Sequence, residues 1–399
     1  YTNFVNILYN IITKLKIKTE MKAIVKDKTS CVDYVFPFEG EKHLATLIIL
    51  PYRDDTWREK AKPAMAEYLN LVKAIAPIER VIVIIDPRIP YQTVNDFQIE
   101  NVTVYRLFCD DSWARDTLPV FLQNPKDSEL LGVDFGFNSW GGDFDGLYKP
   151  WDNDNTLGRK VLLEMRMPRY PYKDFILEGG SIHTDGEGTI LTTDECLLSK
   201  GRNPSLTKDQ IENNLLKSLN AKKVLFLPFG IYEDETDGHV DNIACFSKPG
   251  TVLLAWTDDE KDPQYERSKA DYDFLINQTD AQGRKLEVIK VLLPEVQYLT
   301  KEEAEGINAD KNAIQRKPGR RLAASYINFY QSADFVIVPQ FGVKEDQIAV
   351  NQFKEIYPAK KIIPLYSREI LLGGGNIHCI TKQVPFSKLY PIEPEDIEK

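Results

Sequence analysis

The run Gly-Gly-Gly-Asn-Ile-His-Cys at residues 373–379 ends in Cys379, a thiol in chemically unusual surroundings. Glycine-rich, polar sequence is poor material for a core strand, but it lets backbone pack tightly around a reacting centre. A cysteine thiolate is a strong nucleophile. A lone cysteine can equally be a buried, inert small hydrophobe. Cys379 is therefore a candidate nucleophile that needs partners elsewhere in the chain.

An acidic run at residues 233–242 contains a candidate acid/base. His239 and Asp241 lie two residues apart in it, so on a strand both side chains would point to the same face. Such a pair sets a proton donor beside an anion, and the surrounding acids would attract a cationic substrate. A metal site would need another histidine or cysteine at a defined spacing. A structural, salt-bridged histidine is the other interpretation of His239.

Two further clusters place carboxylates beside glycines or an aromatic ring. Glu178 lies where an apolar run meets paired glycines, so it can clamp a cation, accept a proton or simply cap a turn. Trp113 and Asp116 belong to the segment 110–117. A cation prefers carboxylates together with an aromatic face. The alternative for this segment is a turn with an exposed ion pair between Arg115 and a carboxylate.

Together these residues form a set suited to attack on a guanidinium carbon. That carbon is planar and cationic, so carboxylates must hold its N–H groups in bidentate fashion. The thiolate of Cys379 would add to it, and ammonia would leave after protonation by His239. Water activated by the same histidine would then resolve the covalent thiouronium to a ureido product. A papain-like protease also uses cysteine and histidine but has little need for clustered acids.

Composition restricts the class of protein. The chain has 399 residues, 43% of them hydrophobic, and a net charge of -10, which disfavours nucleic-acid and anionic-membrane partners. Its five cysteines and four histidines are scattered, so neither a zinc site nor a disulfide framework is expected. No apolar run approaches the roughly 20 residues of a membrane span. We expect a cytoplasmic enzyme with reduced thiols, no metal and no cofactor.

Short apolar strands separated by helical stretches predict one continuous α/β domain. The expected strands are residues 45–50, 81–85, 102–107, 120–122, 189–193, 224–227, 252–256, 286–293, 335–338 and 361–364. The expected helices are residues 57–75, with Pro63 near its start, 155–163, 207–219, with Ser205 or Thr207 as its cap, and 346–356. Residues 1–20 are taken as a leader outside the fold, with Met21 as the start of a single domain at 21–399.

One short internal sequence repeat, called the internal echo below, links two of the clusters. Glu-Gly-Gly-Ser-Ile-His at 178–183 matches Gly-Gly-Gly-Asn-Ile-His at 373–378, each after an apolar run. Such a match indicates duplicated ββαβ modules, whose equivalent loops a propeller would bring together. Chance similarity between two glycine turns is the alternative.

Taken in order, these clusters resemble the motifs of the agmatine deiminases, in the guanidine-modifying superfamily related to bacterial-type peptidyl-arginine deiminases. The resemblance runs from about residue 36 to about residue 385. Its motifs lie at residues 113–117, 135–142, 178–183, 193–198, 234–242, 256–260 and 371–379. It implies a five-bladed, pseudo-symmetric α/β propeller (pentein) of ββαβ modules.

The resemblance also implies roles for single residues. Cys379 corresponds to the nucleophile, His239 to the acid/base and Glu178 to its partner on the guanidinium. Asp116 and Asp241 match the carboxylates that clamp the guanidinium, and Trp113 packs over the substrate. The far amine is assigned to Glu235, which precedes His239 in the acidic run. The implied reaction converts agmatine and water to N-carbamoylputrescine and ammonia, and the implied assembly is a homo-oligomer.

One position departs from the family pattern. The family usually reads Asp-Thr-Gly-Pro where this chain has Asp116-Thr117-Leu118-Pro119. If that glycine adopts a positive φ, Leu118 would strain the loop that carries Asp116. Two other functions stay open. A deiminase of free or peptidyl arginine would need a positive group such as Arg115, Arg202 or Arg321, and a catalytically silent propeller would bind a cation without releasing ammonia.

Overall fold

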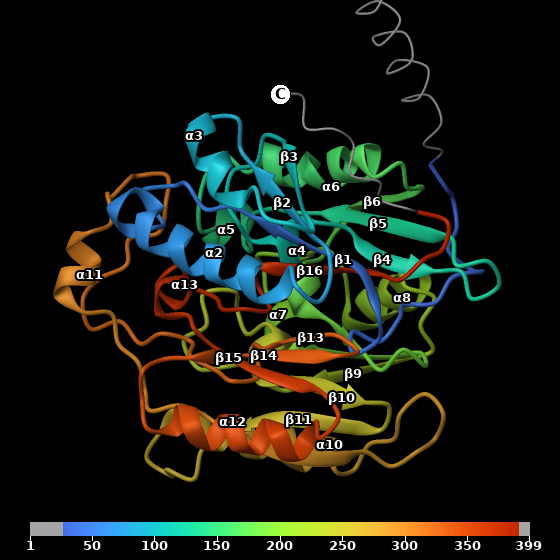
Figure 1. The fold of residues 1–399 in the computed structure, drawn as a ribbon. Coiled ribbons are helices and arrows are strands. Elements are labelled where there is room, and N and C mark those ends of the chain that lie inside the picture. The colour runs from blue at the N-terminus through green and yellow to red at the C-terminus, as the bar shows by residue number, and fades with distance from the viewer. Residues whose placement is uncertain (1–26, 391–399) are drawn as a thin grey trace, which may run out of the picture.

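Five small sheets make up the protein in a computed structural model that describes residues 27–390 (Figure 1). The expected leader and Met21 lie outside the described residues. Four sheets have three strands and one has four. Together they form the five-bladed α/β propeller that the sequence predicts. No helix within residues 27–390 is long and apolar enough to cross a membrane.

Each blade repeats the same pairing. In blade 2, β4 (Val120–Gln123) runs antiparallel to β5 (Leu130–Gly136), and β5 runs parallel to β6 (Arg169–Ile176) after the crossover helix α6 (Asp152–Glu164). A parallel neighbour requires such a crossover, whereas an antiparallel one needs only a short turn. The predicted ββαβ module is therefore present.

The next three blades follow the same order of strands. Blade 3 has β7 (His183–Thr184), β8 (Thr189–Thr193) and β9 (Lys223–Leu227); blade 4 has β10 (Ala244–Lys248), β11 (Thr251–Trp256) and β12 (Glu287–Leu292); blade 5 has β13 (Tyr330–Gln331), β14 (Phe335–Gln340) and β15 (Lys361–Tyr366).

Blade 1 joins the two ends of the described chain. Its strand order is β16 (Thr381–Pro385), β1 (His43–Ile49), β2 (Val81–Ile85) and β3 (Val102–Arg106). β16 pairs antiparallel with β1, with Ile48 opposite Thr381. The last strand thus takes the place that the first strand of a module holds in the other blades. This pairing closes the ring and fixes residues 373–379 at its centre.

Helices connect the strands, and the longer ones cover the outer faces of the blades (Figure 1). The longer ones are α2 (Lys62–Ile75), α6, α8 (Lys208–Ser218), α10 (Pro263–Leu275) and α12 (Glu345–Ile356), and the shorter ones are α3 (Tyr91–Val94), α4 (Ala114–Thr117), α5 (Gly142–Asp145), α7 (Asp194–Leu197), α9 (Val240–Ile243), α11 (Lys301–Glu305) and α13 (Arg368–Leu372). α12 packs against β15 and against β12 of the neighbouring blade (Figure 1, bottom).

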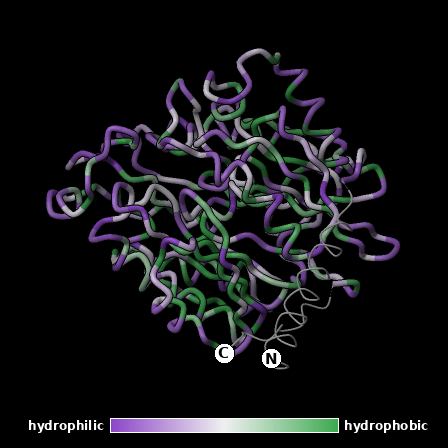
Figure 2. The backbone as a smooth tube through the Cα atoms, turned by 90° about the horizontal axis from the view of Figure 1, so that it is seen from above, coloured by the Kyte–Doolittle hydropathy of each residue, from purple (hydrophilic) through white to green (hydrophobic). Residues whose placement is uncertain are grey.

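Local sequence explains where two of these helices begin. Pro63 lies in the first turn of α2, where its missing N–H costs nothing, and the expected helix from residue 57 is interrupted before it by a kinked turn. Thr207 caps α8 and forms a capping box with Gln210, which selects Thr207 over Ser205. In Figure 2 hydrophobic segments run through the interior, while hydrophilic residues predominate along the outer loops.

Candidate active site

Side chains from all five blades meet on the propeller axis. In each blade the contributing residue lies in the loop that precedes the first strand: Asp116 before β4, Glu178 before β7, His239 before β10, Asn328 before β13 and Cys379 before β16. All five residues are at least nine-tenths buried. The fold therefore brings together residues that are far apart in the sequence.

Gly180 is the point of closest approach among these loops. A Cβ atom there would lie 2.6 Å from Nδ1 of His239 and 2.9 Å from carboxylate oxygens of both Asp116 and Asp241. Only glycine leaves room for three functional side chains around one backbone atom. The paired glycines after Glu178 thus serve close packing, as the sequence indicates.

His239 lies between two carboxylates. Its Nδ1 is 3.9 Å from Oδ2 of Asp116, and its Nε2 is 3.7 Å from Oε2 of Glu178. Burial would lower the pKa of His239, but the charge of Asp116 and the Glu178 carboxylate outweigh burial and raise that pKa well above its ordinary value. The expectation that His239 and Asp241 share a strand face is wrong, because the single-turn helix α9 starts directly after His239.

Glu178 is held as an anion by a buried arginine. Nε of Arg202 donates to Oε1 of Glu178 at 3.2 Å, and its other nitrogens bond Asp237 and the Thr236 carbonyl. Burial of Glu178 would raise its pKa, but Arg202 and His239 bring the pKa to about 2. The guanidinium of Arg202 is thereby occupied by partners within the protein and is not free to bind the carboxylate of a substrate.

Asp116 is oriented by Trp140 and Gly180. The indole N–H of Trp140 donates to Oδ2 at 2.9 Å, and the Gly180 N–H donates to Oδ1 at 2.8 Å. Trp140 and Ser139 both have a positive φ, 63° and 58°, which is rare for a bulky residue. Backbone strain of this kind typically persists where the surrounding structure requires it. Here it aims an indole N–H at Asp116.

Leu118 does not strain this loop. Its φ is -93° and its ψ is 159°, an extended conformation open to any residue, and its side chain is buried among apolar neighbours. The departure from the family's usual glycine therefore leaves the position of Asp116 intact.

Cys379 lies against Asp241 and beneath Trp113. Its Sγ is 3.5 Å from Oδ2 of Asp241. Burial raises the pKa of the Cys379 thiol well above its ordinary value, and the charges of Asp241 and Asp116 raise it further. A Cβ on Gly375 would lie 2.5 Å from the Trp113 ring and 3.0 Å from Sγ, so this glycine lets ring and thiol share one wall.

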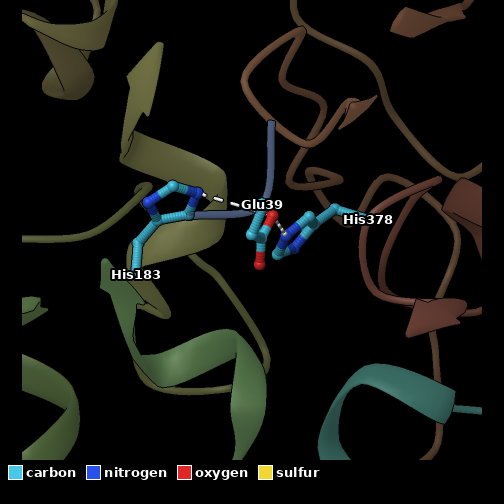
Figure 3. A group of neighbouring side chains, drawn as sticks. All are labelled: Glu39, His183 and His378. Atoms are coloured by element: carbon cyan, nitrogen blue, oxygen red, sulfur yellow. Dashed lines mark hydrogen bonds and ion pairs between the residues drawn. The ribbon is translucent and has the colours of Figure 1, made fainter. Parts of the chain in front are cut away.

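A buried chain of charges supports Asp241 from behind. Nδ1 of His378 lies 2.9 Å from Oδ2 of Asp241, and its Nε2 lies 2.9 Å from Oε2 of Glu39. Figure 3 shows Glu39 between His378 and His183, the two histidines of the internal echo. Burial of Asp241 would raise its pKa, but His378 outweighs burial and lowers it. Equivalent loops do meet at the centre, as the echo predicts.

Arg115 belongs to this chain of charges. Its Nη1 donates to Oε1 of Glu39 at 2.8 Å, and its side chain is 1% exposed. The alternative of an exposed Arg115 ion pair is therefore wrong. Arg115 is also not free to meet a substrate, because its Nε bonds the His378 carbonyl.

The cavity above Cys379 is narrow in this structure. Its free volume at the scale of a water molecule is about 20 Å³, enough for roughly one water. Trp113, Trp140, Glu235 and Arg316 help to line it. A guanidino compound is larger, so the lining side chains must shift when one enters.

Among residues 27–390, two clusters bring histidine, cysteine or carboxylate atoms within 4.8 Å of one another. They are Glu39 with His183 and His378, and Glu178 with Cys196 and His239. In each the carboxylate already pairs with a buried arginine, Arg115 or Arg202. A second cation would be repelled by that guanidinium. The charge balance therefore favours pairing within the protein over metal binding.

Three buried atoms of these central residues have no hydrogen-bond partner among the described residues: Oδ1 of Asp241, and Nε2 of His239 and Oε2 of Glu178, which face each other as an ion pair 3.7 Å apart. Buried polar groups are nearly always hydrogen-bonded, so a cluster of exceptions calls for a functional explanation. Oδ1 of Asp241 is thus available to a polar ligand beside Sγ, and the His239–Glu178 pair, 3.7 Å apart, leaves each partner a hydrogen bond still to make.

Comparison with known proteins places these residues in a family. The family model of the Porphyromonas-type peptidyl-arginine deiminases matches residues 35–385. The chain belongs to this family. It is 49% identical over 349 residues to "Putative agmatine deiminase 1" of Listeria monocytogenes, covering 88% of this chain and 96% of that one.

Solved structures of family members share the propeller. The agmatine deiminase of Enterococcus faecalis is 40% identical, covers 90% of this chain and 99% of its own, and has a TM-score of 0.87. A cysteine-to-serine variant of C. jejuni agmatine deiminase, with substrate bound, is 26% identical, covers 89% and 96%, and has a TM-score of 0.76.

Sequence reasoning named seven site residues, and the structure gathers six of them around Sγ or its immediate neighbours; Glu235 lines the same cavity as Cys379. It missed Trp140, Glu39, His378's link to Asp241, and Asn328. Trp140 lies in a quoted motif, so an aromatic beside a Gly-Gly pair was an available signal. Glu39 and Asn328 carry no local pattern.

Proposed function

We propose that this protein is an agmatine deiminase, a hydrolase that converts agmatine and water to N-carbamoylputrescine and ammonia. The observation that carries the proposal is the convergence of Cys379, His239 and three carboxylates at the centre of the propeller, where buried atoms of Asp241, Glu178 and His239 lack hydrogen-bond partners. A guanidinium offers flat N–H groups to Oε2 of Glu178 and Oδ1 of Asp241, which matches bidentate carboxylate recognition. The relatives named for this activity support the choice of substrate.

Binding of the guanidinium prepares the nucleophile. In the free protein the Cys379 pKa is high because the thiol is buried beside Asp241 and Asp116. A guanidinium held by these carboxylates neutralises their charge and adds a positive one next to sulfur. Both effects favour the thiolate, and the thiol proton passes to solvent because His239 is already protonated. The thiolate sulfur of Cys379 then attacks the guanidinium carbon and forms a C–S bond.

His239 then serves first as acid and afterwards as base. As an imidazolium between Asp116 and Glu178, it protonates one nitrogen of the tetrahedral adduct. The C–N bond breaks, ammonia leaves, and an S-alkyl thiouronium remains on Cys379. The neutral His239 takes a proton from water, which attacks the same carbon. Collapse breaks the C–S bond, releases the ureido product and returns the thiolate.

Glu235 is our candidate for the far amine of agmatine. It lines the same cavity as Cys379 and Asp116, next to Gly374. Its carboxylate is 7% exposed and pairs with Arg316. A carboxylate has lone pairs enough to accept from more than one cation. Substrate ammonium would share Glu235 with Arg316 or replace it.

Parallel ammonia-release assays test the proposal. Agmatine, free arginine and a peptide ending in arginine are supplied separately to the purified protein. We expect release from agmatine at a kcat/KM at least about a hundredfold above that for either arginine substrate, since the additional carboxylate of arginine offers Glu235 no hydrogen-bond donor. Preference for an arginine substrate would overturn the choice of agmatine. Tight agmatine binding without ammonia would instead favour a silent binder.

The cellular compartment and the oligomeric state of the protein are also proposals. All five cysteines are free and buried, which suits a reducing compartment such as the cytoplasm. We expect a homo-oligomer, and light scattering of the purified protein measures its mass directly.

A further inference from the structure

We propose that Asn328 is a catalytic residue whose amide N–H donates to the Cys379 thiolate and stabilises it for attack. The inference rests on the proposed function only in naming the reaction that the thiolate performs. Nδ2 of Asn328 lies 3.1 Å from Sγ of Cys379, and the Asn328 side chain is fully buried.

The orientation of the Asn328 amide is fixed by its oxygen. Oδ1 accepts from the backbone N–H of His378 at 3.0 Å and of Cys379 at 3.3 Å. Two N–H donors can be satisfied only by the oxygen end of the amide. The NH₂ end must therefore face the sulfur, and its second contact is the Asp241 carbonyl at 3.4 Å.

Deprotonation of Cys379 strengthens the hydrogen bond between Nδ2 of Asn328 and Sγ. While Cys379 is a thiol, its S–H can donate to Oδ2 of Asp241 at 3.5 Å or to Oδ1 of Asn328 at 3.4 Å. Once the proton leaves, sulfur can only accept, and Nδ2 of Asn328 is the side-chain donor aimed at it among the described residues. Hydrogen bonds to an ionised acceptor are about twice as strong as neutral ones. Asn328 thus favours the thiolate over the thiol.

The propeller gives an independent reason to assign a function to Asn328. Blades 2, 3, 4 and 1 each place a proposed catalytic side chain in the loop before their first strand. Asn328 occupies that position in blade 5, two residues before β13. A residue that merely braced the loop would not need its donor end on the reacting sulfur. The fifth blade therefore completes the ring of functional side chains.

Two variants distinguish a role of Asn328 as hydrogen-bond donor to sulfur from a purely structural role in its loop. Asn328→Ala removes the whole amide, whereas Asn328→Asp keeps its shape and the acceptor for the two backbone N–H groups but turns an oxygen toward sulfur. Asn214→Ala is the control, because it also removes an amide that makes two hydrogen bonds, to Tyr172 and the Gln210 carbonyl, on helix α8.

The readout is the rate at which iodoacetamide alkylates Cys379, measured across pH by peptide mass spectrometry, together with kcat and KM for agmatine. The groups that face the thiol are Asp241, Asp116, His239 and His378, and all stay unchanged. We expect Asn328→Ala to slow alkylation and kcat about tenfold or more at neutral pH, with KM nearly unchanged and recovery as pH rises. Asn328→Asp should slow both alkylation and kcat further than Asn328→Ala.

Three results would overturn the proposal: alkylation profiles that coincide with wild type, a loss equal at every pH, or full activity in Asn328→Asp. Alkylation does not require agmatine to be the substrate. A wild-type protein that releases no ammonia from agmatine would therefore refute the proposed function while leaving the test of Asn328 intact.

Discussion

The guanidinium of Arg316 holds the carboxylate of Glu235 with two nitrogens: Nη2 lies 2.6 Å from Oε2, and Nε lies 2.9 Å from Oε1. Arg320 adds a third contact, with Nη1 at 3.2 Å from Oε1. The residue proposed for the substrate's amine thus already carries a cation. Recognition of agmatine at this end is an exchange or sharing between positive charges.

Glu235→Gln should raise the KM for agmatine about tenfold or more, since an ionic hydrogen bond contributes roughly 1.5–3 kcal/mol. The kcat should change less, because Glu235 is assigned to the amine of agmatine and not to its reacting carbon. For butylguanidine, which lacks the amine, the KM of this variant should differ little from that of the wild type. Steady-state kinetics on both compounds measure this. The control is Glu233→Gln, at an exposed position; equal losses for both compounds would exclude Glu235 from the tail site.

His239→Gln should lower kcat by about 10²–10⁴-fold, the usual contribution of a positioned acid/base. The fold should persist, because glutamine fills similar space between Asp116 and Glu178. Ammonia release and circular dichroism of the same sample measure the two effects. A kcat within about tenfold of wild type would mean that another group moves the proton.

The kcat should persist through neutral pH and fall only at alkaline pH. His239 works first as an imidazolium, and its pKa is raised well above the ordinary value by Asp116 and Glu178 against the effect of burial. In an unfolded chain it would lose its proton near the ordinary pKa. The charged form therefore stabilises the fold below that value, and the contribution is lost as pH rises through the raised pKa. A kcat profile that needs neutral His239, rising with pH near about 6.5, would contradict this.

Gly180→Ala should cost about a hundredfold or more in kcat/KM. Its Cβ would lie 2.6 Å from His239 and 2.9 Å from Asp116 and Asp241, so all three must move. Displacements of about 1 Å at a reacting centre have effects of this size. Kinetics beside a thermal melt distinguish misplacement from unfolding. Wild-type kcat/KM in a folded variant would show that these three side chains do not act together.

Glu39→Ala should destabilise the protein by about 3–5 kcal/mol, because it leaves the buried guanidinium of Arg115 without its carboxylate. The control is Glu305→Ala, which breaks an exposed pair with Lys301 and should change stability by about 0.5 kcal/mol or less. Urea unfolding of both variants gives the comparison. Similar losses would mean that the axial ion pair contributes no more than a surface one.

The sequence predicted many strands and helices that have a local signature, although the apolar strand β5 and the helix α10 were missed. The strands β2 and β8 begin and end where expected, and Thr207 caps its helix. β16 was missed because its residues, Thr-Lys-Gln-Val-Pro, lack an apolar pattern and become a strand only by pairing with distant β1. β13 has two residues, too few for any periodicity to register.

The same contrast holds in the site. Cys379, Glu178 and Asp116 could be recognised because each lies in a dense motif. Asn328 could not, because its position gains meaning only after β13 is known to open a blade. Glu39 lies 339 positions from the His378 that it bonds, and nothing in the local sequence of either residue records that contact.

The most direct test of the account is the mass of intact enzyme quenched during turnover of agmatine. We predict an adduct equal to agmatine less one ammonia, located on Cys379, in wild-type protein and none in Cys379→Ala, which should release no ammonia. Ammonia release at the wild-type rate by folded Cys379→Ala, or an adduct on another residue, would contradict Cys379 as the nucleophile.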